Sequence, residues 1–411
     1  MSATTHRESA GAPPSVSGTA QPGCTAVILP PGAMSLHPIA GMPLIQRTAL
    51  SALRSGFDAV VALAPGDGRV LRALFARDRR TAGIPVIGTA LDAAITTERV
   101  ALIPSDCLVS AAALERVHAA ECNGRPIVLR TDRGGTGIVL GPRACLADVE
   151  QGDLARAAAA AASDTVSLDG ALCIAVPDAR AAAVAERELL QRLAALTADT
   201  DGPIARFDRA LSTRLSRYLV RTPLRPNHVT AIGTLVGLVA AWWLAGGTYL
   251  SGLLGTVLFW VAVIIDGCDG EVARLKFQES HLGYVLDVTT DNAVHVAIFI
   301  GLGVGLYRAA PARSLPWLVA LLVGGFASAT AATMLTLVRR PPSDRPPRSR
   351  RGRLRRRLLR GFEALMNRDF AYMLVALALI GRLDWFLWGA AFGTYVYAAA
   401  LVVVYRWRDA D

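Results

Sequence analysis

The chain has 411 residues, of which 53% are hydrophobic and 18% are charged. This composition excludes a disordered chain and is too apolar for an ordinary water-soluble protein. The net charge is +10, and residues 339–360 alone account for that surplus, because they hold eleven arginines and one aspartate. Such a run is compatible with nucleic-acid binding, but between two apolar segments it indicates a cytoplasmic membrane loop, so we expect no nucleic-acid partner.

The apolar segments change in character at Asn227. Before it they are short and interrupted by charges and prolines, and after it long stretches lack charge. We therefore predict a water-soluble half fused to a membrane half. Residues 1–23 have no apolar core and are rich in small residues and proline, which predicts a disordered tail without a standard signal peptide. The six scattered cysteines show no metal-binding spacing and fit a reducing compartment.

Short apolar strands alternate with helical patterns through the first half of the chain. Strands are predicted at residues 24–29, 59–64, 86–88, 100–103, 127–130 and 137–140. Helices are predicted at residues 44–53, 69–76, 111–119, 153–162 and 179–194. This alternation predicts an α/β domain with a mostly parallel sheet.

Parts of this half resemble sugar-phosphate nucleotidyltransferases. The strand Ala26–Leu29, the turn after it and the segment Pro38–Ile45 are similar to the opening of that family. The segment Ile103–Asp106 is similar to the family's strand that ends in a metal-binding aspartate. The resemblance implies an α/β nucleotidyltransferase-like domain over residues 24–200.

The turn of this domain departs from that family. The family needs a glycine-rich turn with an arginine, and a lysine that neutralises charge on the triphosphate. Here the turn contains Pro30, Pro31 and Met34, and the first 275 residues contain no lysine. We therefore predict that the domain is inactive, and we favour a loop cap over a metal ligand for Asp106.

A helix is predicted at Pro203–Val220, between the two halves. Its apolar residues share one face: Ile204, Phe207, Leu211, Leu215 and Leu219. Its arginines lie elsewhere on the helix: Arg206, Arg209, Arg214 and Arg217. An ordinary surface helix would show the same pattern. The position before the first membrane span favours an amphipathic helix in the headgroup region, within residues 201–226.

Six apolar segments follow and predict six transmembrane helices within residues 227–411. They are 229–249, 253–265 with an extension, 285–306, 315–338, 370–380 and 386–405. The fifth segment reaches spanning length only if it begins near Phe362. Placing the arginine-rich loop in the cytoplasm puts both termini on that side of the inner membrane.

Four aspartates lie at the end of the second span and the start of the third: Asp266, Asp269, Asp287 and Asp291. Carboxylates within a membrane are costly and indicate a functional site. The spacings i,i+3 and i,i+4 put each pair on one helix face. With Gln278 at the apex of a hairpin, all four would reach similar depths. Such a cluster requires cations, and oxygen ligands favour Mg²⁺ or Mn²⁺.

The fixed positions around these aspartates match the signature of the CDP-alcohol phosphotransferase family. The pattern is Asp266-x2-Asp269-Gly270-x2-Ala273-Arg274-x8-Gly283-x3-Asp287-x3-Asp291, with all eight fixed positions present. The upstream segment with Asn227 and Thr230 is similar to the family's entry to its first span. The resemblance implies six spans around a polar cavity open to the cytoplasm. It also implies transfer of a substituted phosphate from a CDP-alcohol to an alcohol, with release of CMP.

Roles for individual residues follow from this resemblance. Asp266, Asp269 and Asp287 would bind metal, and Asp291 would be both a metal ligand and the general base. Two divalent ions would hold the pyrophosphate. The small residues and the arginine of the signature would line the CDP site together with the two upstream residues: Asn227, Thr230, Gly267, Gly270, Ala273, Arg274 and Gly283. Arg339, Arg340 and Arg368 are weaker candidates for an acceptor site, because topology alone could explain the first two.

The segment Gly202–Arg206, which leads out of the first domain, and the segment Asn367–Phe370 in the fifth span are similar to a subgroup of this family. With them, the two halves resemble a fusion of a CTP:inositol-phosphate cytidylyltransferase with a di-inositol-phosphate phosphate synthase. The first hypothesis is a membrane phosphotransferase of phospholipid synthesis whose first domain is inactive, with CDP-diacylglycerol or CDP-inositol as donor. The second is a bifunctional cytidylyltransferase and phosphotransferase. The third is an ion-coupled transporter. The acceptor, an alcohol or a phosphorylated alcohol, stays open, and so does a homodimer.

Overall fold

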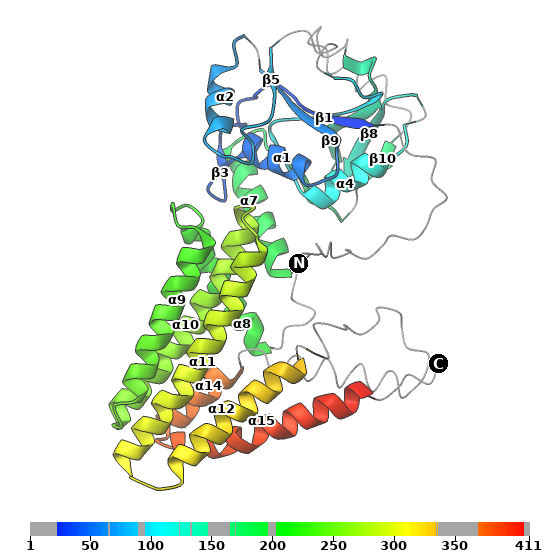
Figure 1. Cartoon of the computed structure of the whole chain (residues 1–411). Coiled ribbons are helices and arrows are strands. Elements are labelled where there is room, and N and C mark those ends of the chain that lie inside the picture. The colour runs from blue at the N-terminus through cyan, green and yellow to red at the C-terminus, as the bar shows by residue number, and fades with distance from the viewer. Residues whose placement is uncertain are drawn as a thin grey trace, which may run out of the picture. The chain divides into compact units, whose positions relative to one another are not determined.

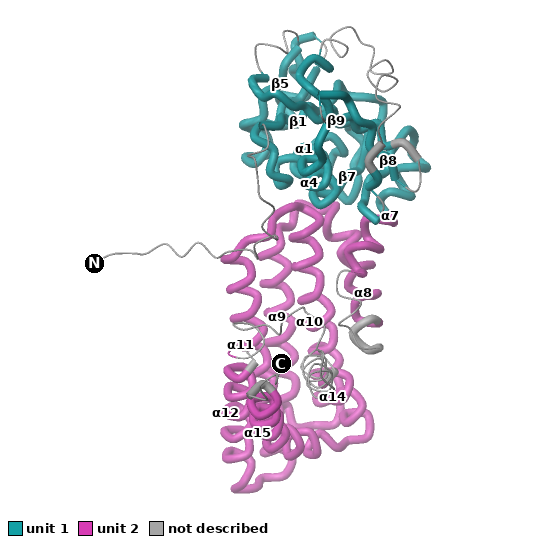
Figure 2. The backbone as a smooth tube through the Cα atoms, turned by 90° about the vertical axis from the view of Figure 1, so that its right-hand side faces the viewer, with its two compact units in different colours: residues 1–186 teal, residues 187–411 magenta. Residues whose placement is uncertain are grey.

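The computed structural model describes residues 23–64, 66–88, 95–122, 124–131, 134–146, 165–168, 170–195, 203–333, 335 and 369–406. The tail expected at residues 1–22 and the helix expected at residues 153–162 lie outside this set. The chain divides into two compact units, residues 1–186 and residues 187–411 (Figure 2).

The first unit is built on a seven-stranded sheet with the strand order β10-β8-β9-β6-β1-β4-β5. The strands are β1 (Cys24–Ile28), β4 (Ala59–Leu63), β5 (Val86–Ile87), β6 (Arg99–Ile103), β8 (Ile127–Thr131), β9 (Gly134–Pro142) and β10 (Thr165–Ser167). Strand β1 pairs in parallel with β4 and β6, whereas β9 runs antiparallel between β6 and β8. The mixed α/β class predicted from the sequence is confirmed.

Helices pack on this sheet (Figure 1). The helices α1 (Leu44–Leu53), α2 (Arg69–Ala76) and α4 (Ala111–Ala119) have the predicted bounds, and α7 (Ala179–Ala195) is one residue longer. Helix α4 begins where it does because the Ser110 side chain accepts a hydrogen bond from the Ala113 N–H at 3.2 Å. The prediction missed the pairs β2 (Pro38–Ile39) with β3 (Met42–Pro43) and β7 (Cys107–Val109) with β11 (Cys173–Ala175), because two or three residues are too few to show a period.

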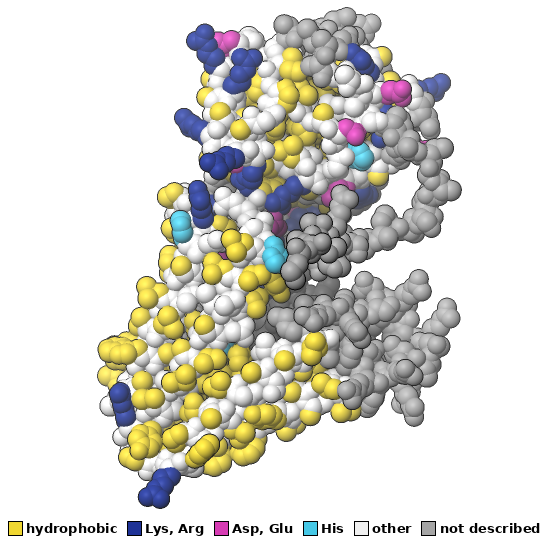
Figure 3. All heavy atoms as spheres, viewed as in Figure 1, with side chains coloured by type: hydrophobic (Ala, Val, Ile, Leu, Met, Phe, Trp, Pro, Cys, Tyr) yellow, Lys and Arg dark blue, Asp and Glu magenta, His cyan; other side chains and the backbone are white. Residues whose placement is uncertain are grey.

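The second unit is helical. Its helices are α8 (Pro203–Leu219), α9 (Pro226–Leu244), α10 (Tyr249–Leu275), α11 (His281–Ala309), α12 (Leu315–Thr333), α14 (Asp369–Leu379) and α15 (Leu383–Arg406). Among the described residues, five helices are long and apolar enough to cross a membrane, and α14 is a shorter apolar helix. Hydrophobic side chains gather over these long helices on the face seen in Figure 3. The expected start of the fifth span near Phe362 lies outside the described residues.

The boundary between the first two spans differs from the prediction, which ran the first span to Tyr249. Helix α9 ends at Leu244, the chain turns at Gly247 with a φ of +76°, and α10 begins at Tyr249. The Thr248 side chain accepts a hydrogen bond from the Ser251 N–H at 3.1 Å and so caps α10. Hydropathy alone did not show this boundary, because the turn is short and contains no charged residue or proline that would interrupt the uncharged stretch.

Glycines allow α9 and α11 to approach each other closely, and Figure 1 shows α9, α10 and α11 side by side. A Cβ atom on Gly301 would lie 2.2 Å from the Ala241 carbonyl oxygen. A Cβ atom on Gly305 would lie 2.0 Å from the Leu244 carbonyl oxygen. These backbone atoms cannot move aside without separating the helices, so the contact between α9 and α11 depends on the two glycines.

We expect Gly305→Ala to destabilise the helical unit by about 1–3 kcal/mol, because the added methyl group would collide with the backbone of α9. The measurement is thermal unfolding of the full chain in detergent. Gly389→Ala is the matched control, because no atom lies within 4 Å of a Cβ at that exposed position on α15. Equal unfolding temperatures for the two variants would contradict the close packing of α9 and α11.

Helix α8 presents a polar face to α10. Asp208, Ser212 and Ser216 are buried, whereas Phe207 and Leu215, predicted on an apolar face, are exposed. The short serine side chains allow α8 to lie close to α10, where the Ser216 hydroxyl is 3.5 Å from the Cys268 carbonyl oxygen. Phe207 and Leu215 of α8 are therefore available to its surroundings instead of the protein core.

Candidate active site

The hairpin between α10 and α11 positions the aspartates. Helix α10 ends in a Schellman motif, in which the Gln278 N–H donates to the Ala273 carbonyl at 2.8 Å and the Phe277 N–H to the Arg274 carbonyl at 3.3 Å. Phe277 has a φ of +55°, the left-handed conformation that this motif requires. The apex expected at Gln278 is confirmed, since α11 begins at His281.

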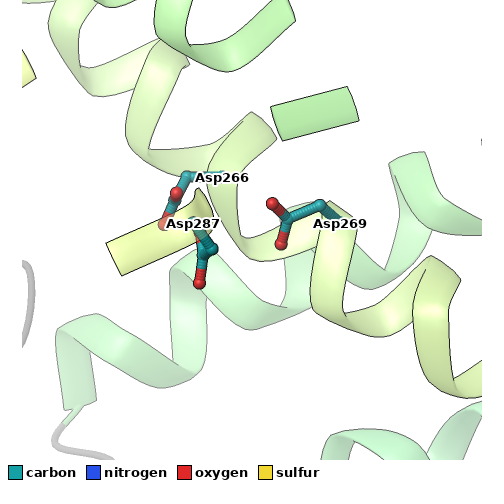
Figure 4. A group of neighbouring side chains, drawn as sticks. All are labelled: Asp266, Asp269 and Asp287. Atoms are coloured by element: carbon teal, nitrogen blue, oxygen red, sulfur yellow. The ribbon is translucent and has the colours of Figure 1, made fainter. Parts of the chain in front are cut away.

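Asp266 and Asp269 on α10 face Asp287 on α11 (Figure 4). One carboxylate oxygen from each lies within 4.8 Å of the others. Asp269 is buried and the other two are half-buried. Three converging carboxylates repel one another unless cations lie between them, and oxygen ligands of this kind suit Mg²⁺ or Mn²⁺. The residues therefore fit a divalent cation.

Thr230 on α9 holds one of these carboxylates in place. Its hydroxyl donates a short hydrogen bond to Asp269 Oδ2. Thr230 lies one helical turn after Pro226, the first residue of α9. A bond to Oδ2 restricts the rotation of the Asp269 carboxylate, which faces the other two aspartates.

Asp291 lies one turn further along α11 and is not part of the three-carboxylate group. Its side chain is 47% exposed, and its Oδ1 is 3.1 Å from Nδ1 of His295. Asp291 and Asp266 line a small cavity of about 20 Å³, large enough for one water-sized group. The four aspartates therefore divide into a cluster of three and a fourth beside a separate small cavity.

A larger cavity of about 250 Å³ borders the three-carboxylate group. It is lined by Pro226, Asn227, Thr230, Asp269, Gly270, Ala273, Arg274, Gln278, Glu279, Ser280, Gly283, Tyr284 and Asp287. Six of the seven residues expected at the CDP site are in this set. Gly267, the seventh, is half-buried on α10 and lies outside this lining.

Two glycines make room in this cavity. A Cβ atom on Gly270 would lie 3.6 Å from the guanidinium nitrogens of Arg274. A Cβ atom on Gly283 would lie 3.1 Å from the Ser280 hydroxyl and 3.5 Å from Asn227 Oδ1. A side chain at Gly283 would press on the Ser280 hydroxyl, whereas a methyl group at Gly270 would make only ordinary contact with the Arg274 guanidinium but would occupy cavity space.

Lys276, the single lysine of the chain, was missed as a site residue. Its ammonium donates hydrogen bonds to the carbonyls of Thr222 at 2.7 Å and Leu224 at 2.6 Å. Burial lowers the pKa of Lys276 below its ordinary value. These bonds tie the loop before α9 to the end of α10, on either side of the larger cavity. A lysine in a chain that otherwise uses only arginine was the signal that could have identified it.

We expect Lys276→Met to raise the KM for the nucleotide donor about tenfold, because hydrogen bonds to a charged group contribute about 1.5–3 kcal/mol. Their loss would release the loop that positions Asn227 and Thr230. Steady-state kinetics of CMP release check this, with Arg217→Met on the exposed face of α8 as the charge-matched control. A donor KM that is the same in both variants would remove Lys276 from the site.

Glu271 was also missed, although a glutamate within an apolar helix was a visible signal. It is fully buried, and its Oε1 accepts hydrogen bonds from Ser212 at 2.7 Å and Thr213 at 3.2 Å. Arg209 Nη1 is 3.8 Å from the same oxygen. The acidic end of α10 is therefore anchored to α8. Arg339, Arg340 and Arg368, the candidate acceptor residues, lie outside the described residues.

Comparison with known proteins identifies the second half. Residues 224–404 match the model of the CDP-alcohol phosphatidyltransferase family. The C-terminal half therefore contains a CDP-alcohol phosphatidyltransferase domain. The polar cavity and the three-carboxylate group both lie within this phosphatidyltransferase domain.

Curated relatives match parts of the chain. It is 34% identical over 131 residues to the bifunctional IPC transferase and DIPP synthase of Rubrobacter xylanophilus, covering 31% of this chain and 29% of that protein. It is 34% identical over 92 residues to the phosphatidylinositol phosphate synthase of Mycobacterium tuberculosis, covering 22% and 42%. The chain thus spans less than a third of the length of the first relative and less than half of the second.

A solved structure overlaps the chain only loosely. The crystal structure of Mycobacterium tuberculosis phosphatidylinositol phosphate synthase with CDP-DAG bound has a TM-score of 0.34 and 19% identity. It covers 47% of this chain and 92% of that one. At this score the overlap supports no conclusion about the site of the phosphatidyltransferase domain.

Proposed function

We propose that this chain is an integral membrane enzyme of polar-lipid synthesis, which transfers a substituted phosphate from a CDP-alcohol to an alcohol and releases CMP. One observation carries the proposal. Residues from α9, α10 and α11 that match the family signature line a single cavity, and two of the three clustered carboxylates border it. An ion-coupled transporter would need the carboxylates but not the surrounding glycines and Arg274.

Asp266, Asp269 and Asp287 would hold the divalent cations, two Mg²⁺ or Mn²⁺ ions in the proposed enzyme. When bound, the cations stabilise negative charge on the donor pyrophosphate and on the departing CMP. The carboxylate positions are prepared by the protein, because Thr230 restrains Asp269 and the hairpin sets α10 against α11.

Other residues act on the substrates. Arg274 presents a guanidinium to the cavity, where it can pair with donor phosphate oxygens. Asp291 accepts the proton of the acceptor hydroxyl while the oxygen of that hydroxyl bonds to the phosphorus of the substituted phosphate. The bond from that phosphorus to the bridging oxygen breaks, and CMP leaves with the electron pair. Arg339, Arg340 and Arg368 remain the proposed contacts for an anionic acceptor.

An apolar cavity favours a lipid-linked donor. It measures about 290 Å³ and is lined by Thr230, Ala231, Thr234, Leu235, Leu238, Leu286 and Thr290 of α9 and α11. Thr230 lines this cavity and the polar one, so the two adjoin. A nucleotide in the polar cavity could place an acyl chain in the apolar one, which favours CDP-diacylglycerol over CDP-inositol.

The proposed topology has six spans in the cytoplasmic membrane, with both termini and the site facing the cytoplasm. In this proposal the fifth span begins near residue 362 and includes α14, and α15 is the sixth. The basic residues 339–360 support this orientation. Residues 201–226 form the interfacial segment, and the exposed Phe207 and Leu215 of α8 suit the boundary between headgroups and acyl chains.

The first domain, residues 24–200, has a nucleotidyltransferase-like origin in this proposal but no activity. The turn after β1 is held by hydrogen bonds within the domain. The Gly32 N–H donates to the Ser35 hydroxyl at 2.7 Å, and the Ser35 hydroxyl is 2.8 Å from that of Ser105, which follows β6. The polar groups of the turn that could bind a triphosphate are thus already hydrogen-bonded to protein atoms. Asp106 lies beside it, with Oδ2 3.1 Å from a Cβ position on Gly32.

We expect the full chain to release no pyrophosphate from CTP and Mg²⁺ with any of a panel of sugar or inositol phosphates. The turn contains prolines and Met34 where a triphosphate needs donors and a cation. A coupled pyrophosphate assay measures this. The alternative is a bifunctional cytidylyltransferase and phosphotransferase, and a curated relative is named as bifunctional. Pyrophosphate release above the background without enzyme would establish that alternative.

The experiment that tests the main proposal is a screen of CDP-alcohols and acceptors with purified protein in detergent or vesicles. CMP release that depends on both a donor and an acceptor supports the proposed transfer. If no CDP-alcohol yields CMP, and a cation gradient across vesicles is instead dissipated, the transporter hypothesis replaces it.

A further inference from the structure

His295 lies one turn after Asp291 on α11 and faces back toward it. Its Nδ1 is 2.7 Å from the Asp291 carbonyl oxygen and 3.1 Å from Asp291 Oδ1. Both oxygens are acceptors, so Nδ1 carries a proton and donates it to them. The imidazole is 13% exposed, and the carboxylate that it contacts is 47% exposed. A half-buried imidazole therefore contacts a carboxylate that is more exposed than itself.

Aromatic rings from three other helices surround the imidazole. Phe326 of α12 stacks on it with ring centroids 5.5 Å apart and an interplanar angle of 19°. Phe370 of α14 lies at 5.1 Å, and Phe259 of α10 meets it edge-on at 5.8 Å. These contacts restrict the rotation of the ring, so Nδ1 stays directed at Asp291.

The apolar surroundings of His295 do not by themselves explain why an imidazole is present among these rings. An apolar side chain would pack among three phenylalanines without the cost of burying two polar nitrogens. A histidine that bonded only to a backbone carbonyl of its helix would gain one local hydrogen bond. The second contact, to Asp291 Oδ1, distinguishes His295 from a packing residue, because it reaches the side chain to which the proposed reaction assigns proton transfer.

We propose that His295 is a positioning residue that orients the Asp291 carboxylate toward the acceptor hydroxyl. The proposal rests on the proposed function. Asp269 is likewise restrained by a hydrogen-bond donor, the Thr230 hydroxyl, so one aspartate of the three-carboxylate group and Asp291 outside it each have an orienting donor. His295 touches neither substrate in this assignment, and its effect passes through Asp291.

An orienting role predicts a loss in turnover with donor binding retained. A small misplacement of a reacting group costs about a hundredfold in rate. We therefore expect His295→Leu to lower kcat about 10- to 100-fold, with a donor KM within about threefold of the parent. His295→Asn keeps an N–H near the position of Nδ1, so it should recover most of the lost kcat.

The control variant is Phe386→Leu. Phe386 packs against Phe299 and Phe370 in the same aromatic cluster but makes none of the ring contacts to His295. We expect it to lower the thermal unfolding temperature while leaving kcat nearly unchanged. Donor affinity measured by calorimetry without acceptor separates binding from turnover in all variants.

The outcomes are distinguishable. An active parent whose His295→Leu variant retains kcat within about threefold overturns the positioning role and leaves the proposed function intact. Equal losses in the Leu and Asn variants, or a loss confined to donor affinity, also overturn it. A parent that releases CMP from no CDP-alcohol overturns the proposed function and, with it, the role assigned to His295.

Discussion

Removal of divalent cations with a chelator is expected to reduce CMP release to the background rate, a loss of at least about a thousandfold. Cations at such a site supply several kcal/mol of charge stabilisation, and each 1.36 kcal/mol is about tenfold in rate. Asp266, Asp269 and Asp287 bring three negative charges to within 4.8 Å, so without cations the donor pyrophosphate would also be repelled. Added Mg²⁺ or Mn²⁺ should restore the rate.

Binding can be checked independently of turnover. Mn²⁺ should raise the unfolding temperature of the parent, because a ligand that binds the folded state stabilises it. The Asp269→Asn variant should show a smaller rise, since it loses a buried ligand of the group. Full activity in cation-free buffer, or an unfolding temperature that does not respond to Mn²⁺, would contradict a metal-dependent site.

Asp291→Asn should lower kcat by about 10²–10⁴ with little change in donor affinity, because an amide cannot accept the acceptor's proton. Asp291 is not part of the three-carboxylate group and lines a small cavity beside Asp266, which supports a role at the acceptor. Asp287→Asn should behave differently and weaken cation and donor binding together. Kinetics over a range of donor and Mg²⁺ concentrations separate these two patterns.

Asp384→Asn is the control for these variants, because Asp384 is in the first turn of α15 and outside the carboxylate group. It should match the parent in kcat and in KM. If Asp291→Asn is as active as this control, another group accepts the proton. If Asp287→Asn keeps normal cation dependence, the three-carboxylate group is not the metal site.

The sequence determined the features that depend on residues close together in the chain. The bounds of α1, α2 and α4 followed from apolar spacing, because a helix face repeats within a few residues. The α10–α11 hairpin and its aspartate pairs followed from i,i+3 and i,i+4 spacing around Gln278. The apolar composition of the second half likewise indicated membrane helices, and five helices among the described residues are long and apolar enough to cross a membrane.

Tertiary structure decided what depends on contacts between distant residues. It left Asp291 outside the three-carboxylate group, because Asp291 lies one turn beyond Asp287 on α11 and lines a small cavity with Asp266. It enclosed His295 in rings from three other helices and brought Lys276 to carbonyls more than fifty residues away. It also turned the serines of α8 toward α10. Local spacing cannot encode such contacts, because they arise only when separate helices pack and satisfy one another's polar groups.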